Sequence, residues 1–241
     1  VPASDLAVAL GNRAVMALLG PRTLPRLELK QGIPDDLRTL VAVPSMLTTR
    51  QALDEQVERL EVHYLANSEG ALHFALITDW VDASGEAFAG DDDLLAAAVH
   101  GIARLNQRYG LMPDGRSRFL LLHRRRVWNE SEHCWMGWER KRGKIEEFNR
   151  LLRGATDTSF GLPVGDLSIL PKVRYCITLD SDTRLPRDAA RQLIGIISHP
   201  LNRPTFDPEA GRVTDGYGIL QPRISVTFTS AAGSLFSRLY S

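Results

Sequence analysis

Two aspartates one residue apart, Asp180 and Asp182, follow an apolar stretch in the segment 173–186 (VRYCITLDSDTRLP). Burying two unpaired carboxylates side by side costs free energy, so this pair needs a metal ion, basic neighbours or bulk water. Alternate residues of a strand share a face, so both side chains could reach one ion. Mg²⁺ prefers carboxylate oxygens and often bridges to substrate phosphates. The pattern predicts a divalent-cation site that binds a diphosphate; the alternative is that the aspartates only cap the next helix.

A basic segment, 135–144 (WMGWERKRGK), places Arg140, Lys141, Arg142 and Lys144 around Gly143 where a helix is expected to begin. Cations oppose the helix dipole at an N-terminus, so a purely structural choice would place acidic residues there. Free backbone N–H groups and basic side chains together suit a diphosphate. The segment indicates a phosphate clamp, and a solvated basic face is the alternative.

Other polar groups are expected at the same edge. Asp79 ends a predicted strand, where it could accept a hydrogen bond from a ribose or a base or could serve as a turn former; Asp82 is a weaker candidate. The loop after Pro44 should lie beside it. One of the three consecutive arginines at 124–126 should face this edge and the others should be solvated. The six histidines form no metal-binding pattern, and we interpret them as surface or hydrogen-bonded residues.

Strand and helix patterns alternate along the chain with short connections. We expect strands over residues 39–44, 72–79, 119–127, 173–179 and 218–226, and helices over 49–67, 91–109, 139–152 and 187–198. Such alternation predicts an α/β fold: an open, mostly parallel sheet with helices on both faces. In these sheets ligands bind outside the carboxyl ends of the strands, where all the candidate residues fall.

The first 38 residues differ from the rest, which we expect to form one domain over 39–241. Residues 6–19 predict an amphipathic helix with Ser4 or Asp5 as N-cap and Gly20-Pro21 as its stop. It would pack on the domain surface or lie at a membrane interface. It is shorter than the roughly 20 residues that cross a bilayer, and no secretory signal is evident. Residues 21–34 are proline-spaced and predict an extended lead-in.

The composition of the chain and the motifs that it lacks exclude several other classes of protein. The 241 residues are 44% hydrophobic and carry 29 basic and 29 acidic side chains, so no global field attracts nucleic acid. The two cysteines, Cys134 and Cys176, lack metal-ligand spacing and fit a reducing compartment. The dinucleotide G-x-G-x-x-G, P-loop and G-x-S-x-G motifs do not occur.

The order of motifs resembles the processive inverting glycosyltransferases of the GT-A fold, the cellulose-synthase-like class. A strand ending in VAVP is followed by a strand ending in Asp79, a K-R-G-K helix start, a strand ending in D-S-D-T, and I-L-Q-P-R-I-S. More narrowly, residues 2–10 (PASDLAVAL), 43–67 (VPSMLTTRQALDEQVERLEVHYLAN) and 138–154 (WERKRGKIEEFNRLLRG) resemble the cyclic β-1,2-glucan synthase family. The similarity covers nearly the whole chain.

This resemblance implies that the donor is UDP-glucose and that the acceptor is a growing β-1,2-glucan. Asp79 would contact the uridine, Asp180 the ribose or the metal, and Asp182 the metal, which would be Mg²⁺ or Mn²⁺. Lys141 and Gly143 match the motif that approaches the donor diphosphate, and Pro44 ends the strand beside it. The parent would be a large bacterial inner-membrane enzyme whose transferase domain faces the cytoplasm.

One feature of that family is missing from the sequence. An inverting transferase needs a general base for the acceptor hydroxyl, and the family's T-E-D-like and Q-x-x-R-W motifs do not occur before Ser241. We therefore expect the donor-binding portion of a longer enzyme, without its acceptor half, which turns over slowly or not at all alone. An exposed face where the missing half would pack could drive self-association.

Two other classes of protein remain as alternatives. A haloacid-dehalogenase-type phosphohydrolase also begins from D-x-D, but that class requires Thr or Val two positions after the second aspartate, where Arg184 stands. A non-catalytic module that binds nucleotide sugars is favoured only by the missing base.

Overall fold

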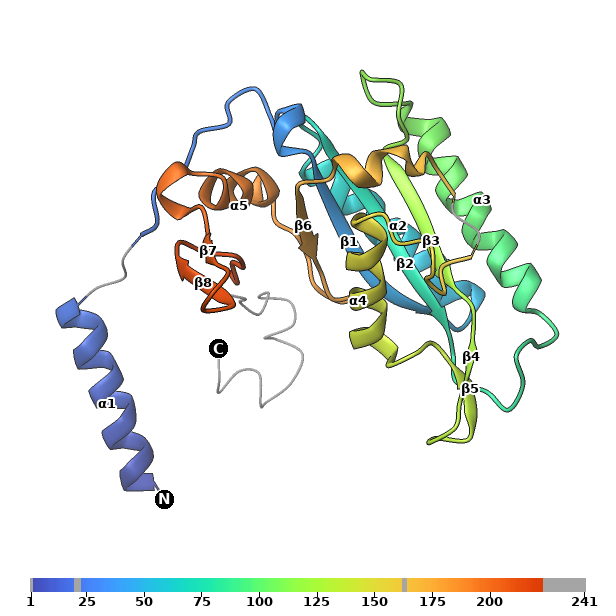
Figure 1. Ribbon diagram of the computed structural model, residues 1–241, viewed down its shortest axis with the longest axis horizontal. Helices are drawn as coiled ribbons and strands as arrows, with labels where there is room; N and C mark the ends of the chain where they lie inside the picture. The colour runs from blue at the N-terminus through green and yellow to red at the C-terminus, as the bar shows by residue number, and fades with distance from the viewer. Residues whose placement is uncertain (1, 20–22, 162–163, 223–241) are drawn as a thin grey trace.

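A four-stranded parallel sheet forms the centre of the molecule (Figure 1). The computed structural model describes residues 2–19, 23–161 and 164–222. The strand order is β3-β2-β1-β6, and all neighbouring pairs are parallel. The strands are β1 (Thr39–Leu47), β2 (Leu72–Trp80), β3 (Phe119–Arg124) and β6 (Tyr175–Thr178). The predicted open, parallel α/β sheet is therefore confirmed.

The central strands are apolar along their length because both of their faces are covered. All nine residues of β2 are buried, as are eight of the nine in β1. Continuous apolar runs, in place of alternating apolar and polar residues, are typical of parallel strands packed between two helical layers. The two strands pair in register from Thr39 opposite Leu72 to Leu47 opposite Trp80, so their carboxyl ends meet at one edge.

Helices cover both faces of the sheet, as predicted. On one face, α2 (Arg50–Ala66), α3 (Asp91–Tyr109) and α5 (Ala189–Ile197) contribute Leu60, Ile102 and Ile194 to the larger core. On the other face, α4 (Arg140–Leu152) and the short 3-10 helix η2 (Leu167–Lys172) contribute Phe148 and Ile169 to a second core.

Local signals set several helix ends where they were expected. The Thr49 hydroxyl accepts a hydrogen bond of 3.1 Å from the Ala52 amide and caps α2. Gly90 and Gly110, both with positive φ, flank α3, whose bounds agree with the prediction. Its first turn carries three consecutive aspartates, which suit the positive end of the helix dipole.

Three predicted strands are wrong in length. The first was expected to end at Pro44, but β1 continues to Leu47, so Pro44 lies inside the strand. The predicted strand 119–127 stops at Arg124, and Val127 begins a separate hairpin of β4 (Val127–Asn129) and β5 (Cys134–Met136). The predicted strand 173–179 is reduced to β6, so its paired aspartates lie beyond the strand. The helix expected from residue 187 begins two residues later, with α5.

The two ends of the chain also differ from expectation. Helix α1 (Pro2–Leu19) begins before Ser4, so neither Ser4 nor Asp5 is its N-cap; Gly20 and Pro21 lie outside the described residues. Its described side chains are exposed, so the expected packing on the domain surface is not observed. Among the described residues, no helix has the length and apolarity needed to cross a membrane.

The fifth strand expected over 218–226 is not present in residues 218–222, and 223–226 lie outside the described part. A short hairpin of β7 (Thr205–Asp207) and β8 (Arg212–Asp215) precedes this stretch. The remaining short elements are the 3-10 helices η1 (Asp35–Leu37) and η3 (Pro200–Asn202).

Candidate functional site

A pocket of about 380 Å³ lies at the carboxyl edge of the sheet. The strand order reverses between β1 and β6, and ligands of open α/β sheets bind at such a switch point. The volume falls in the range of small-molecule sites. The pocket is lined by the ends of β1 and β2, the start of α2, the start of α4 and the turn after β6: Pro44, Ser45, Met46, Thr48, Ala52, Gln56, Asp79, Trp80, Asp82, Gly137, Arg140, Lys141, Lys144 and Ser181.

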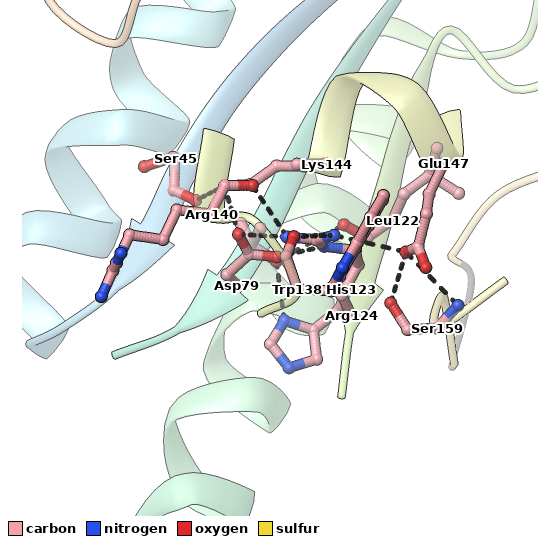
Figure 2. Close-up of polar contacts among 11 residues, drawn as sticks. Ser45, Asp79, Leu122, His123, Arg124, Trp138, Arg140, Lys144, Glu147 and Ser159 are labelled. Atoms are coloured by element: carbon pink, nitrogen blue, oxygen red, sulfur yellow. Dashed lines mark hydrogen bonds and ion pairs between the residues drawn. The ribbon is translucent and has the colours of Figure 1, made fainter. Parts of the chain in front are cut away.

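Asp79 lies in the pocket wall and is held by two buried cations (Figure 2). Arg124 donates from Nε to Oδ1 at 2.6 Å and from Nη2 to Oδ2 at 3.0 Å, and Lys144 Nζ lies 3.1 Å from Oδ2. Each carboxylate oxygen can accept two hydrogen bonds, so Oδ1 retains one accepting direction. Asp79 is 3% exposed, and its charge is compensated within the protein.

Lys144 connects the first turns of α4 to the end of β1. Its Nζ donates to the backbone oxygen of Ser45 as well as to Asp79. Burial lowers the pKa of Lys144, and the Asp79 carboxylate opposes that shift. Of the predicted basic group, Arg140, Lys141 and Lys144 line the pocket, and Lys144 is in addition a buried link between α4 and two strands.

Asp180 and Asp182 lie in a turn at the pocket rim, and the prediction that they alternate along a strand is wrong. The turn is closed by a hydrogen bond of 2.9 Å from the Thr183 amide to the Asp180 carbonyl oxygen. Ser181, between the two aspartates, lines the pocket. Lys141 Nζ donates to Asp180 Oδ1 across the pocket mouth. The exposed Asp182 side chain has no polar partner within the described part of the chain.

Helix α2 and its C-cap residue, Asn67, hold this turn in place. Arg59 donates to the Ser181 carbonyl oxygen at 2.7 Å. The buried Asn67 donates to the Pro186 carbonyl oxygen at 3.0 Å and accepts from the Ala190 amide at 3.1 Å. These contacts place the segment between β6 and α5 against the same helix that lines the pocket.

The donor set of the turn fits a hard divalent cation. Two exposed carboxylates on one turn can supply the one or two protein ligands that Mg²⁺ takes, with water and phosphate oxygens completing the shell. A second group, Asp82, Glu132 and Cys134, has ligand atoms within 4.8 Å of one another. Arg140 already donates to both of its carboxylates. The turn with Asp180 and Asp182 therefore stays the candidate for the predicted cation site, with Asp180 paired to Lys141 and Asp182 without a polar partner in the described ranges.

The predicted glycine does not line the pocket. Gly143 is buried in α4, where an added Cβ would lie 2.0 Å from the Trp138 carbonyl oxygen. It permits close contact between the helix and the preceding chain. Gly137 does line the pocket, and a Cβ there would lie 2.8 Å from both Asp79 Cγ and Arg124 Nη2. The sequence analysis missed Gly137, although the G-x-x-x-x-x-G spacing around the basic residues offered a weak signal.

The expectation for the arginine triplet is corrected. Arg124 and Arg126 are buried, at 0% and 3% exposure, and only Arg125 is exposed. Arg124 reaches the pocket wall, whereas Arg126 pairs with Asp91 on the α3 side at 2.6 Å. The sequence analysis also missed Gln56, which lines the pocket and whose Oε1 is buried without a hydrogen-bond partner in the described ranges.

Together, the fold and the site define an α/β domain with a Rossmann-like open sheet and a charged pocket at its carboxyl edge. No protein-family model matches the chain. Over 242 aligned residues, which include the whole chain, it is 47% identical to the cyclic β-(1,2)-glucan synthase NdvB of Rhizobium meliloti (strain 1021). The chain spans 8% of the length of that protein. The resemblance expected from the sequence motifs is thereby confirmed.

Proposed function

We propose that this chain is the donor-binding portion of a glycosyltransferase that transfers glucose from UDP-glucose to a growing β-1,2-glucan with inversion. The observation that carries the proposal is the pocket at the strand switch point, which joins a basic helix start to a turn bearing two carboxylates. The 47% identity to a cyclic β-(1,2)-glucan synthase supports the class of reaction.

The residues have distinct parts in this proposal. Asp180 and Asp182 would hold Mg²⁺ or Mn²⁺, which would supply Lewis-acid neutralisation of the charge on the leaving UDP. Lys141 would turn from Asp180 to the donor diphosphate and share that charge. Asp79 would accept a hydrogen bond from the uridine through the free direction on Oδ1, beside Pro44 in the same wall.

Formation of the glycosidic bond requires a general base that deprotonates the acceptor hydroxyl. The acceptor 2-hydroxyl would attack the anomeric carbon from the face opposite UDP, and a general base would take its proton. We assign that base to no described residue, because the two carboxylates that line the pocket, Asp79 and Asp82, are paired with cations. By the same resemblance, we propose that the chain works within a larger enzyme at the cytoplasmic face of a bacterial inner membrane.

Calorimetric titration of UDP in the presence of Mn²⁺ tests the proposal. Asp182→Ala should abolish Mn²⁺-dependent UDP binding and leave thermal unfolding unchanged, since this exposed carboxylate makes no hydrogen bond or ion pair in the described part of the protein. Asp157→Ala is the matched control, because Asp157 is an exposed aspartate whose one ion-pair partner among the described residues is Arg150. Wild-type affinity in the Asp182 variant would refute the assignment.

A further inference from the structure

Arg124 uses every donor of its guanidinium group within the protein (Figure 2). Arginine has five N–H donors. Two go to the Asp79 carboxylate, one lies 3.3 Å from Glu147 Oε2, and two reach the backbone oxygens of Trp138 and Arg140 at 3.1 and 3.0 Å. The side chain is 0% exposed. One buried group thus connects β2 and β3 to the chain that begins α4.

The backbone that Arg124 contacts is strained. Glu139 and Arg140 have φ values of 51° and 46°, a region that costs free energy for residues other than glycine. Such a conformation persists only where the surroundings fix it. The carbonyl groups bound by Arg124 belong to Trp138, just before this pair, and to Arg140, its second member. Arg124 therefore holds the strained segment on both sides.

The same segment supplies the basic side of the pocket. Gly137, Arg140, Lys141 and Lys144 line it, whereas Arg124 does not. We infer that Arg124 is a positioning residue: it fixes the start of α4 and thereby places Lys141 and its neighbours for a nucleoside diphosphate. This inference deepens the proposed function and rests on it for the identity of the ligand.

Lysine cannot replace Arg124 in this role. An ammonium group keeps the positive charge beside Asp79 but lacks the planar fork that reaches two carboxylates and two carbonyl groups at once. Arg124→Lys should therefore preserve the buried charge and release the start of α4.

A matched control lies two residues along the chain. Arg126 is also buried, and it donates to the carbonyl oxygens of Val81 and Glu86 and to the Asp91 carboxylate. It makes none of the contacts to α4 that Arg124 makes. Its guanidinium lies over the ring of Trp80, on the β2 side of the pocket, so Arg126→Lys should cost similar stability and leave the start of α4 unaffected.

Two measurements on these variants test the inference. UDP affinity in the presence of Mn²⁺ should fall by about tenfold or more in Arg124→Lys and stay at the wild-type value in Arg126→Lys. Amide hydrogen exchange in residues 138–144 should accelerate in the first variant alone. A folded Arg124→Lys protein with wild-type exchange in this segment, or with wild-type UDP affinity, would overturn the inference.

The inference can still be tested if Arg124→Lys does not fold or if the wild-type chain does not bind UDP. If Arg124→Lys does not fold, Glu147→Gln weakens one of the five contacts and should produce a smaller acceleration of exchange in 138–144; an unchanged rate would contradict the inference. If the wild-type chain binds no UDP, the proposed function fails. Exchange in 138–144 then still decides whether Arg124 fixes the helix start.

Discussion

Lys141 on α4 and Asp180 in the turn after β6 form an ion pair across the mouth of the pocket, although 39 positions separate them in the chain. Both side chains are more than half exposed, at 55% and 58%. The pair joins the group proposed for the diphosphate to one proposed for the metal. We therefore predict that a cation bound at Asp180 would compete with Lys141 and would release the lysine toward the phosphate.

Replacing Lys141 with methionine tests this competition. Exposed ion pairs contribute about 0.2–1 kcal/mol, so Lys141→Met should raise Mn²⁺ affinity in the absence of nucleotide by about 1.4- to 5-fold. UDP affinity should fall, because a phosphate-binding cation is lost. Calorimetry measures both. Arg142→Met removes the same charge one residue away, where the side chain pairs with Glu139, and should change neither value to this extent. Unchanged or weaker Mn²⁺ binding in Lys141→Met would contradict the competition.

Gly143 should tolerate no side chain. The Cβ of an alanine would meet the Trp138 carbonyl oxygen at 2.0 Å and the Trp138 ring at 2.7 Å, so α4 or the preceding chain must move. Gly143→Ala should lower the free energy of unfolding by about 2–3 kcal/mol and weaken UDP binding. Urea denaturation measures the first effect. Gly11→Ala is the control, since a Cβ at that helical glycine has nothing within 4 Å; equal losses in the two variants would count against the close contact.

His123 should make stability depend on pH. Burial lowers the pKa of His123 from 6.5 to about 4, and its Nε2 has no hydrogen-bond partner among the described residues. The unfolded chain takes up a proton below about pH 6.5, whereas the folded chain does so only near pH 4. The stability that the neutral His123 side chain contributes to the folded protein is therefore fully present above about pH 6.5 and is lost as the pH falls from 6.5 toward 4.

The size of this effect follows from linkage. Between about pH 7.5 and pH 5, His123 should account for a loss of about 2 kcal/mol in the free energy of unfolding. His63 and His73 also have lowered pKa values because they are buried, so the wild type must be compared with His123→Gln. Urea denaturation at both pH values measures the difference. The same pH dependence in the variant would show that His123 is not the group responsible.

Much of the fold could be predicted because its signals are local. The apolar runs of β1 and β2 need no knowledge of their partners, and Gly90 and Gly110 mark the ends of α3 in the sequence itself. The position of the pocket followed from one topological rule, that ligands bind at the carboxyl ends of parallel strands.

The polar interior could not be predicted in this way. Arg124 and Arg126 each have a partner 45 positions away, so the sequence around the triplet gives no sign that two of its members are buried. The end of β6 was placed too late for a related reason. Leu179 is apolar and directly follows the strand, but the chain turns there, and the turn is held by contacts from α2 and its C-cap residue Asn67 that are more than 100 residues distant.

The location of Mn²⁺ in a crystal soaked with Mn²⁺ and UDP tests the central claim most directly. Anomalous scattering should place the ion at the carboxylates of Asp180 and Asp182, with the diphosphate between the ion and Lys141. An ion at Asp82, Glu132 and Cys134 instead, or a nucleotide bound outside this pocket, would contradict the account.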